Sequence, residues 1–188
     1  MRLDQVPVSE SHTDRLDLNR PAIQDLDQVY AISSDPRVWE HFPSGRHATR
    51  AQTADLLDRW ISGWTADGLG PWIARRTGET SVIGYGGCNL VSGAVWNLGY
   101  RFAAAEHGYG YATELARQAL RAAEELTPEL PVVAYMLEDN VASARVAIKL
   151  GMGLADRGPD AGNPDPAAVR LIYASRSLSD AELAVMKH

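Results

Sequence analysis

Apolar residues that recur at helical spacing mark the most regular part of this chain. Between residues 112 and 123 they fall at i, i+3, i+4, i+7, i+8 and i+11, which is one apolar face of an α-helix. A second helix is predicted where Thr49 and Gln52 form a capping-box pattern ahead of an amphipathic segment that ends near Gly68. A third is predicted with Pro21 in its first turn, a position that suits proline. The apolar residues of this third helix are Ile23, Leu26, Val29 and Tyr30.

Alternating apolar residues and short apolar runs predict the strands. Leu16 and Leu18 alternate with polar neighbours in TDRLDLNRP (13–21), which indicates one strand. Short TGE and SG turns then separate three strand candidates, so hairpins and an antiparallel meander are expected. These candidates are PWIARR (71–76), SVIGYGGCNL (81–90) and AVWNLGYRF (94–102).

The remainder of the chain alternates strands with helices. PVVAYML (131–137) is predicted as a buried strand, and the segment after it as a helix that Asn140 caps and Gly151 ends. Two last strands, 153–157 and 168–174, flank a turn-rich loop. A short terminal helix follows them, with a capping pattern formed by Ser179 and Glu182.

Composition narrows the class of protein. The 188 residues are 45% hydrophobic and 22% charged, which is typical of one soluble globular domain, expected to span residues 1–188. No signal peptide or apolar run of about 20 residues is found, and the lone Cys88 fits a reducing cytoplasm. A net charge of −6 argues against nucleic-acid binding. No CxxC or HExxH spacing suggests a metal site.

The segment HGYGYA (107–112) contains the clearest candidate chemistry. Two glycines directly before a helix leave first-turn N–H groups free to face a phosphate, with the helix dipole behind them. The alternative is a turn that only joins strand to helix. Tyr111 and Ala112 do not match a Walker A loop, and Thr113 stands where a dinucleotide fingerprint requires a third small residue.

The same segment resembles the acyl-CoA pyrophosphate loop of the GNAT superfamily of N-acetyltransferases, whose pattern is Gln/Arg-x-x-Gly-x-Gly/Ala. His107 departs from the usual Gln or Arg of that pattern. DNVASARVAIKLGM (139–152) resembles the second half of the cofactor site in the RimJ/RimL-like branch, which carries an Asn-x-x-Ser. The stretches 13–21 and 71–87 are similar to the same branch.

This resemblance implies a mixed, mostly antiparallel central sheet flanked by helices, with a V-shaped splay between the two central strands. It also implies transfer of an acetyl group from acetyl-CoA, the cosubstrate, to a primary amine by direct attack. The residues that it assigns to the cofactor are Arg101, Phe102, His107, Gly108, Gly110, Tyr111, Ala112, Asn140 and Ser143.

Two residues carry the catalytic expectations. Ser143 matches the serine of Asn-x-x-Ser and is predicted to protonate the CoA thiolate, the alternative being hydrogen bonding at the helix terminus. Asn140 is expected to hydrogen-bond the pantetheine amide, the alternative being that it only caps the helix. Asn97 stands where relatives often have Glu, and its amide can orient a water but cannot act as a base at neutral pH. Candidate bases are therefore Glu40, His41 and Glu138.

The acceptor is the least determined part of this interpretation. It is either a peptide or protein N-terminus or a small amine, and residues 33–48 and 158–166 are expected to bind it. Two alternatives remain open: an aminoglycoside-type acetyltransferase, and a non-catalytic CoA-binding regulatory module, which Asn97 favours. Trp39 and Trp96 are further candidates for lining an acceptor pocket. No membrane partner is expected, and a homodimer is compatible with the resemblance.

Overall fold

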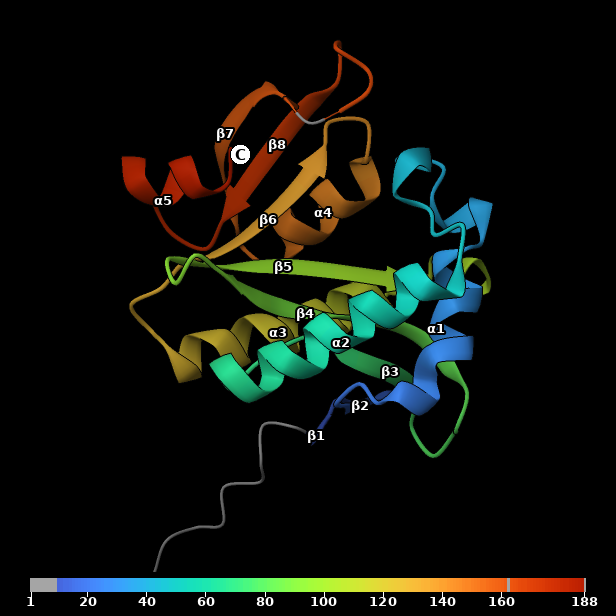
Figure 1. The fold of residues 1–188 in the computed structure, drawn as a ribbon. Coiled ribbons are helices and arrows are strands. Elements are labelled where there is room, and N and C mark those ends of the chain that lie inside the picture. Colours follow the sequence, from blue (N-terminus) through green and yellow to red (C-terminus); the bar gives the residue numbers. More distant parts are fainter. Residues whose placement is uncertain (1–9, 162, 188) are drawn as a thin grey trace, which may run out of the picture.

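A computed structural model describes residues 10–161 and 163–187, which form a mixed sheet of eight strands (Figure 1). The strand order is β1-β2-β3-β4-β5-β6-β8-β7. Every neighbouring pair is antiparallel except β5 and β6, which are parallel. The strands are β1 (Glu10–His12), β2 (Leu16–Asn19), β3 (Trp72–Arg76), β4 (Val82–Val91), β5 (Val95–Phe102), β6 (Val132–Leu137), β7 (Gly153–Pro159) and β8 (Val169–Ala174).

Helices cover both faces of the sheet. The first two helices lie on one face and the long third helix on the other, while the fourth lies beside β6 (Figure 1). The described residues contain no helix long and apolar enough to cross a membrane. The α-helices are α1 (Leu26–Ser33), α2 (Arg50–Asp67), α3 (Tyr111–Leu126), α4 (Val141–Lys149) and α5 (Asp180–Val185).

The predicted meander is confirmed as the hairpins β3–β4 and β4–β5. β4 and β5 pair from Gly84↔Phe102 to Val91↔Val95. The apolar stripe of α3 packs on this meander, and Trp72 and Trp96 are almost completely buried between them. This core fixes the position of β5, whose other edge faces the site described below.

The parallel pairing of β5 with β6 is short. Its register comprises Trp96↔Val132 and Asn97↔Val133. Beyond these residues β5 continues to pair with β4, and β6 continues to pair with β8. From Leu98 in β5 and Ala134 in β6 onward, the two central strands therefore do not pair with each other.

The predicted helix caps are confirmed. Thr49 with Gln52 forms a capping box at α2, and Ser179 with Glu182 forms another at α5. At α4, Asn140 Oδ1 accepts a hydrogen bond from the backbone N–H of Ser143, at 3.1 Å. The left-handed backbone of Gly68 ends α2. The left-handed backbone of Gly151, at φ 80°, follows the end of α4.

The first helix begins later than Pro21 predicts. A 3₁₀ turn, Ile23–Asp25, precedes α1, and Ile23 is 52% exposed. The Asp25 carboxylate accepts the Ala22 N–H at 2.9 Å and pairs with Arg75 on β3 at 2.5 Å. This long-range ion pair holds the turn, so a proline-based prediction misplaces the helix start.

One strand and one strand end also differ from the sequence pattern. The polar segment ESH does not predict a strand, and β1 forms there because it pairs with β2. β7 extends two residues further than expected, to Pro159, along β8. The rest of the predicted loop 158–166 follows, with Gly162 outside the described residues.

Candidate functional site

The glycine loop precedes α3 as a left-handed turn. Gly110 is the N-cap of α3 at φ 85°, and Gly108 has φ 86°. Glycine adopts these angles without steric cost, whereas a Cβ would strain them. Space is open around the Cα of Gly108. The loop therefore presents first-turn amides of α3 to an accessible surface, which suits an anion.

Arg15 braces this loop from the turn before β2. Its Nη1 donates to the Tyr109 carbonyl at 2.9 Å, and its Nε donates to Glu114 at 2.8 Å. The hydroxyl of Thr13 donates to the same carboxylate at 2.6 Å. The guanidinium also lies 4.7 Å from the centroid of the Tyr111 ring. Glu114, which the sequence indicates only as a first-turn acid, thus ties α3 to the N-terminal strands.

His107 connects the loop to the end of β5. Its Nε2 lies 3.0 Å from the Phe102 carbonyl oxygen. Phe102 in turn stacks on Tyr111, with ring centroids 6.1 Å apart. These contacts hold the glycine loop, residues 107–112, against the end of β5 at Phe102.

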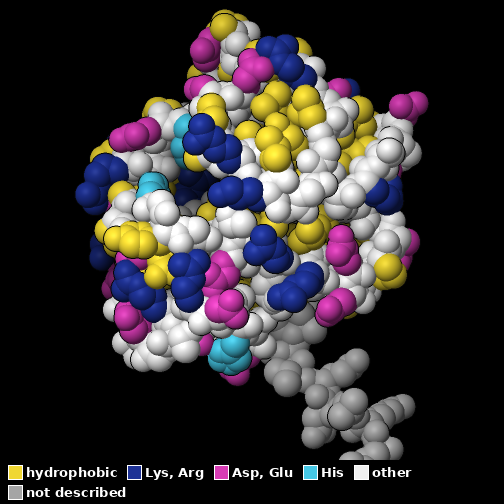
Figure 2. Space-filling model, turned by 180° about the vertical axis from the view of Figure 1, so that it is seen from behind, with side chains coloured by type: hydrophobic (Ala, Val, Ile, Leu, Met, Phe, Trp, Pro, Cys, Tyr) yellow, Lys and Arg dark blue, Asp and Glu magenta, His cyan; other side chains and the backbone are white. Residues whose placement is uncertain are grey.

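Basic side chains gather on the face opposite α1 and α2 (Figure 2). The exposed basic residues of α3 are Arg117 and Arg121, and those of α4 are Arg145 and Lys149. The helix α3 also carries the exposed acids Glu124 and Glu125, whereas α4 carries no acid, so the excess of positive charge that favours an anionic ligand lies along α4.

A cavity of about 250 Å³ opens where β5 and β6 no longer pair. One wall comes from β5 (98–101) and the other from β6 (134–137). Asn140 and Ser143 enter it from α4. The structure thus brings together residues that lie far apart in the sequence, including His41.

Tyr100 lines this cavity although the sequence did not single it out. Burial raises the pKa of its phenol, and the nearby Ser143 opposes that shift. The backbone N–H of Ser143 serves the helix cap, so its hydroxyl can face Tyr100 at the same time. The alternation of side chains along β5 could have indicated this position, because it places Tyr100 on the same face of the sheet as Leu98, toward α3.

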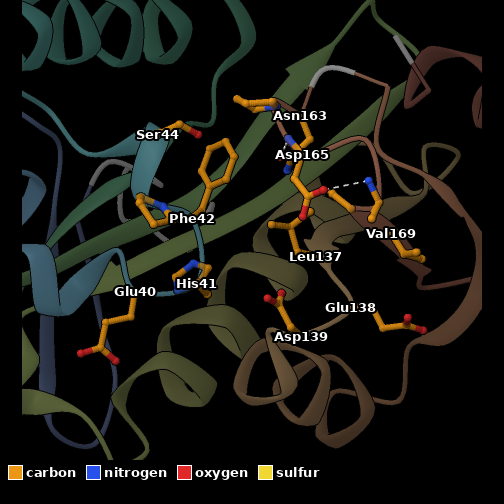
Figure 3. A pocket seen from close by; sticks show the side chains of 14 residues that line it. Glu40, His41, Phe42, Ser44, Leu137, Glu138, Asp139, Asn163, Asp165 and Val169 are labelled. Carbon is orange, nitrogen blue, oxygen red and sulfur yellow. Dashed lines mark hydrogen bonds between the residues drawn. The ribbon is translucent and has the colours of Figure 1, made fainter.

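A second cavity, of about 600 Å³, adjoins the first through His41, Phe42 and Leu137 (Figure 3). Its walls are residues 40–44 on one side and residues 137–139 and 163–169 on the other. Both loops expected to bind the acceptor therefore line it.

The three base candidates differ in their surroundings. Glu138 pairs with Arg157 at 2.6 Å, and this hydrogen bond lowers the pKa of the carboxyl group. Glu40 is exposed. His41 lines both cavities, and burial followed by the charge of Arg101 lowers its pKa. A neutral imidazole at the junction of the cavities is the best placed proton acceptor of the three.

Asn97 lies at the closed end of the strand pair, opposite Val133. Its Oδ1 is buried and has no hydrogen-bond partner among the described residues. It is not one of the residues that line the two cavities. Trp96 is a core residue that donates to Thr127 at 2.6 Å, whereas Trp39 stacks against Arg101 beside the first cavity.

A family model described as an acetyltransferase (GNAT) domain matches residues 15–153. The chain belongs to the GNAT family. The family predicted from the glycine loop, the segment 139–152 and the stretches 13–21 and 71–87 is thus confirmed, and this GNAT protein is an acetyl-CoA-dependent acetyltransferase.

Solved structures share the GNAT fold. The acetyltransferase from Agrobacterium tumefaciens str. C58 is 24% identical, with a TM-score of 0.73 over 94% of this chain and 98% of that one. RimL, the ribosomal L7/L12 alpha-N-protein acetyltransferase solved with coenzyme A, is 15% identical, with a TM-score of 0.74 over 88% and 96%. MccE, the microcin C7 self immunity acetyltransferase solved with acetyl-CoA and AMP, is 14% identical, with a TM-score of 0.72 over 88% and 94%.

Proposed function

We propose that this GNAT enzyme transfers the acetyl group of acetyl-CoA directly to a primary amine, either a peptide or protein N-terminus or a small amine. One observation carries the proposal. The cavity opens where β5 and β6 no longer pair, the glycine loop follows the end of β5, and the larger cavity adjoins the first through His41, Phe42 and Leu137. A cofactor held by the loop and an amine held in the larger cavity would meet beside Tyr100 and Ser143.

The chain's own groups fit the cosubstrate. The left-handed glycines, Gly108 and Gly110, let backbone amides of 110–112 approach a pyrophosphate without a Cβ in the way. The facing edges of β5 and β6 do not pair beyond Asn97 and Val133, which would leave main-chain groups for the pantetheine arm. A backbone N–H near Phe102 would polarise the thioester carbonyl. Relatives solved with coenzyme A or acetyl-CoA support the choice of ligand.

In the reaction, a nitrogen–carbon bond forms to the acetyl group and the carbon–sulfur bond breaks. The attacking ammonium must first lose a proton, because its nitrogen has no lone pair. We assign this proton to His41, directly or through one water, since its lowered pKa keeps the imidazole neutral at pH 7.

The leaving thiolate takes up a proton. Ser143 is assigned as its donor, and Tyr100, which lines the same cavity, as the group that orients the serine hydroxyl. Asn140 is retained as a pantetheine contact through its amide nitrogen, because its oxygen already caps α4.

The test is thiol release from acetyl-CoA with a panel of primary amines, combined with mass spectrometry of the acceptors. Peptides with free N-termini, aminoglycosides and small amines form its arms. Amine-dependent thiol release with a gain of one acetyl group supports the proposal. Tight acetyl-CoA binding by calorimetry without thiol release for any amine would identify a CoA-binding regulatory module instead.

A further inference from the structure

Arg101 is a cation in the first cavity with no anionic partner among the described residues. It lies near the open end of β5, partly buried, and burial lowers the pKa of its guanidinium. Within residues 10–161 and 163–187, no carboxylate lies within ion-pair distance of it. Its Nη1 reaches the Val38 carbonyl and His41 Nε2, both at a long 3.4 Å.

The protein treats comparable arginines differently. Arg75, with a side chain 18% exposed, pairs with Asp25 at 2.5 Å. Arg170, with a side chain 8% exposed, pairs with Asp156 at 2.8 Å. A buried charge without a partner is costly, so such pairing is the usual arrangement. Arg101 departs from it in the cavity where β5 and β6 no longer pair.

The orientation of Arg101 is also fixed. Its Cζ lies 3.5 Å from the centroid of the Trp39 ring, so the indole covers one face of the guanidinium. A guanidinium has five N–H donors in its plane, and a carboxylate matches two of them in parallel. The stacked, planar cation is therefore preorganised to receive a carboxylate in the cavity.

We infer that Arg101 binds the carboxylate of the acceptor, and that the acceptor is a small α-amino acid rather than a protein N-terminus. This inference rests on the proposed function. An amine and a carboxylate on one carbon would lie side by side, so the amine would stand next to His41 when the carboxylate meets Arg101. In a protein N-terminus, the corresponding group is an uncharged amide.

The larger cavity would then hold the acceptor's side chain. Exposed carboxylates on its walls favour a polar or cationic side chain over an acidic one. They are Glu40, Asp139 and Asp165, beside Glu138, which pairs with Arg157. Asp139 stands on the wall opposite His41 (Figure 3). Among the residues that line the two cavities, Arg101 is the one arginine or lysine and is therefore the anion-binding group of the site.

The test compares α-amino acids with their α-amides as acceptors, in the thiol-release assay with acetyl-CoA. An amide has the less basic amino group and so the larger fraction of free amine at pH 7. A preference for the acid thus cannot come from deprotonation. We expect kcat/KM to be about 10- to 100-fold higher for the acid, as a charge-assisted pair provides, and Arg101→Met to abolish this ratio.

Controls separate the possible failures. Arg37→Met removes an exposed guanidinium from the same loop region and should keep the preference for acids, while calorimetry with acetyl-CoA shows that each variant is folded. Equal rates for acids, amides and N-terminal peptides in the unaltered enzyme would overturn this inference and leave the acetyltransferase proposal standing. No thiol release with any amine, despite bound acetyl-CoA, would overturn both.

Discussion

At the scale of single residues, Ser143 and Tyr100 line the same cavity, where the phenol can orient the serine hydroxyl. If that hydroxyl protonates the thiolate, Ser143→Ala should lower kcat by up to ~10²-fold while changing KM for acetyl-CoA much less. Steady-state kinetics measure both constants. The backbone N–H of Ser143 makes the cap bond, so the substitution should leave Tm nearly unchanged.

Tyr100→Phe is the companion variant, because it keeps the ring and removes the phenol hydroxyl that faces Ser143. It should reduce kcat less than Ser143→Ala does, as expected for a positioning residue. A lower Tm for Ser143→Ala with unchanged kcat would instead mean that the serine only supports the helix end.

His41 leads to a prediction about pH. Its pKa lies below the ordinary value of about 6.5, so the neutral base is present above that pH and is lost as pH falls through the lowered pKa. Compared at equal free-amine concentration, kcat/KM should be flat at about pH 7 to 8 and decline below about pH 6.5. A pH–rate profile of the native enzyme measures this acidic limb.

His41→Gln should remove the acidic limb and lower the rate. His47→Gln is the matched control, because burial also lowers the pKa of His47 while its ring contacts Thr53 away from both cavities. An acidic limb that persists in His41→Gln would show that another group takes the amine proton.

At the scale of elements, the left-handed turn before α3 determines cofactor affinity. Valine at 110 would require φ near 85°, and its Cβ would meet Arg15 Nη2 at 3.6 Å. We expect Gly110→Val to weaken acetyl-CoA binding about 10-fold or more, as measured by calorimetry. Gly93→Val places the same residue at φ 65° in open space, in the hairpin at the far end of β5, and should leave the affinity unchanged.

Local signals in the sequence predicted most elements because those signals act within one turn or one strand. The capping boxes at Thr49 and Ser179 are examples, since each involves residues three apart. The start of α1 depended instead on Asp25 meeting Arg75, fifty positions away. The same limit applies to the site. The glycine loop is a local motif, whereas the meeting of His41, Tyr100 and Ser143 depends on strand order.

At the scale of the whole molecule, the short β5–β6 pairing joins the two parts of the sheet, β1–β5 and β6–β8. A ligand that pairs with the open edges of β5 and β6 would connect these parts further. Acetyl-CoA should therefore raise Tm, and at a concentration of 100 Kd it should add about 2.7 kcal/mol to the free energy of unfolding. Hydrogen exchange should show new protection at residues 98–102 or 134–137. Protection confined to other strands would contradict cofactor binding between these edges.

The chain's single cysteine bears on how turnover can be measured. Cys88 is fully buried, and burial raises the pKa of its thiol well above the ordinary range. A disulfide reagent that colours on reaction with thiolates would therefore not register the folded enzyme, and every equivalent of colour would count one coenzyme A released. Adding denaturant at the end of the assay would expose one further equivalent per chain, so each reaction mixture would contain its own calibration of enzyme concentration.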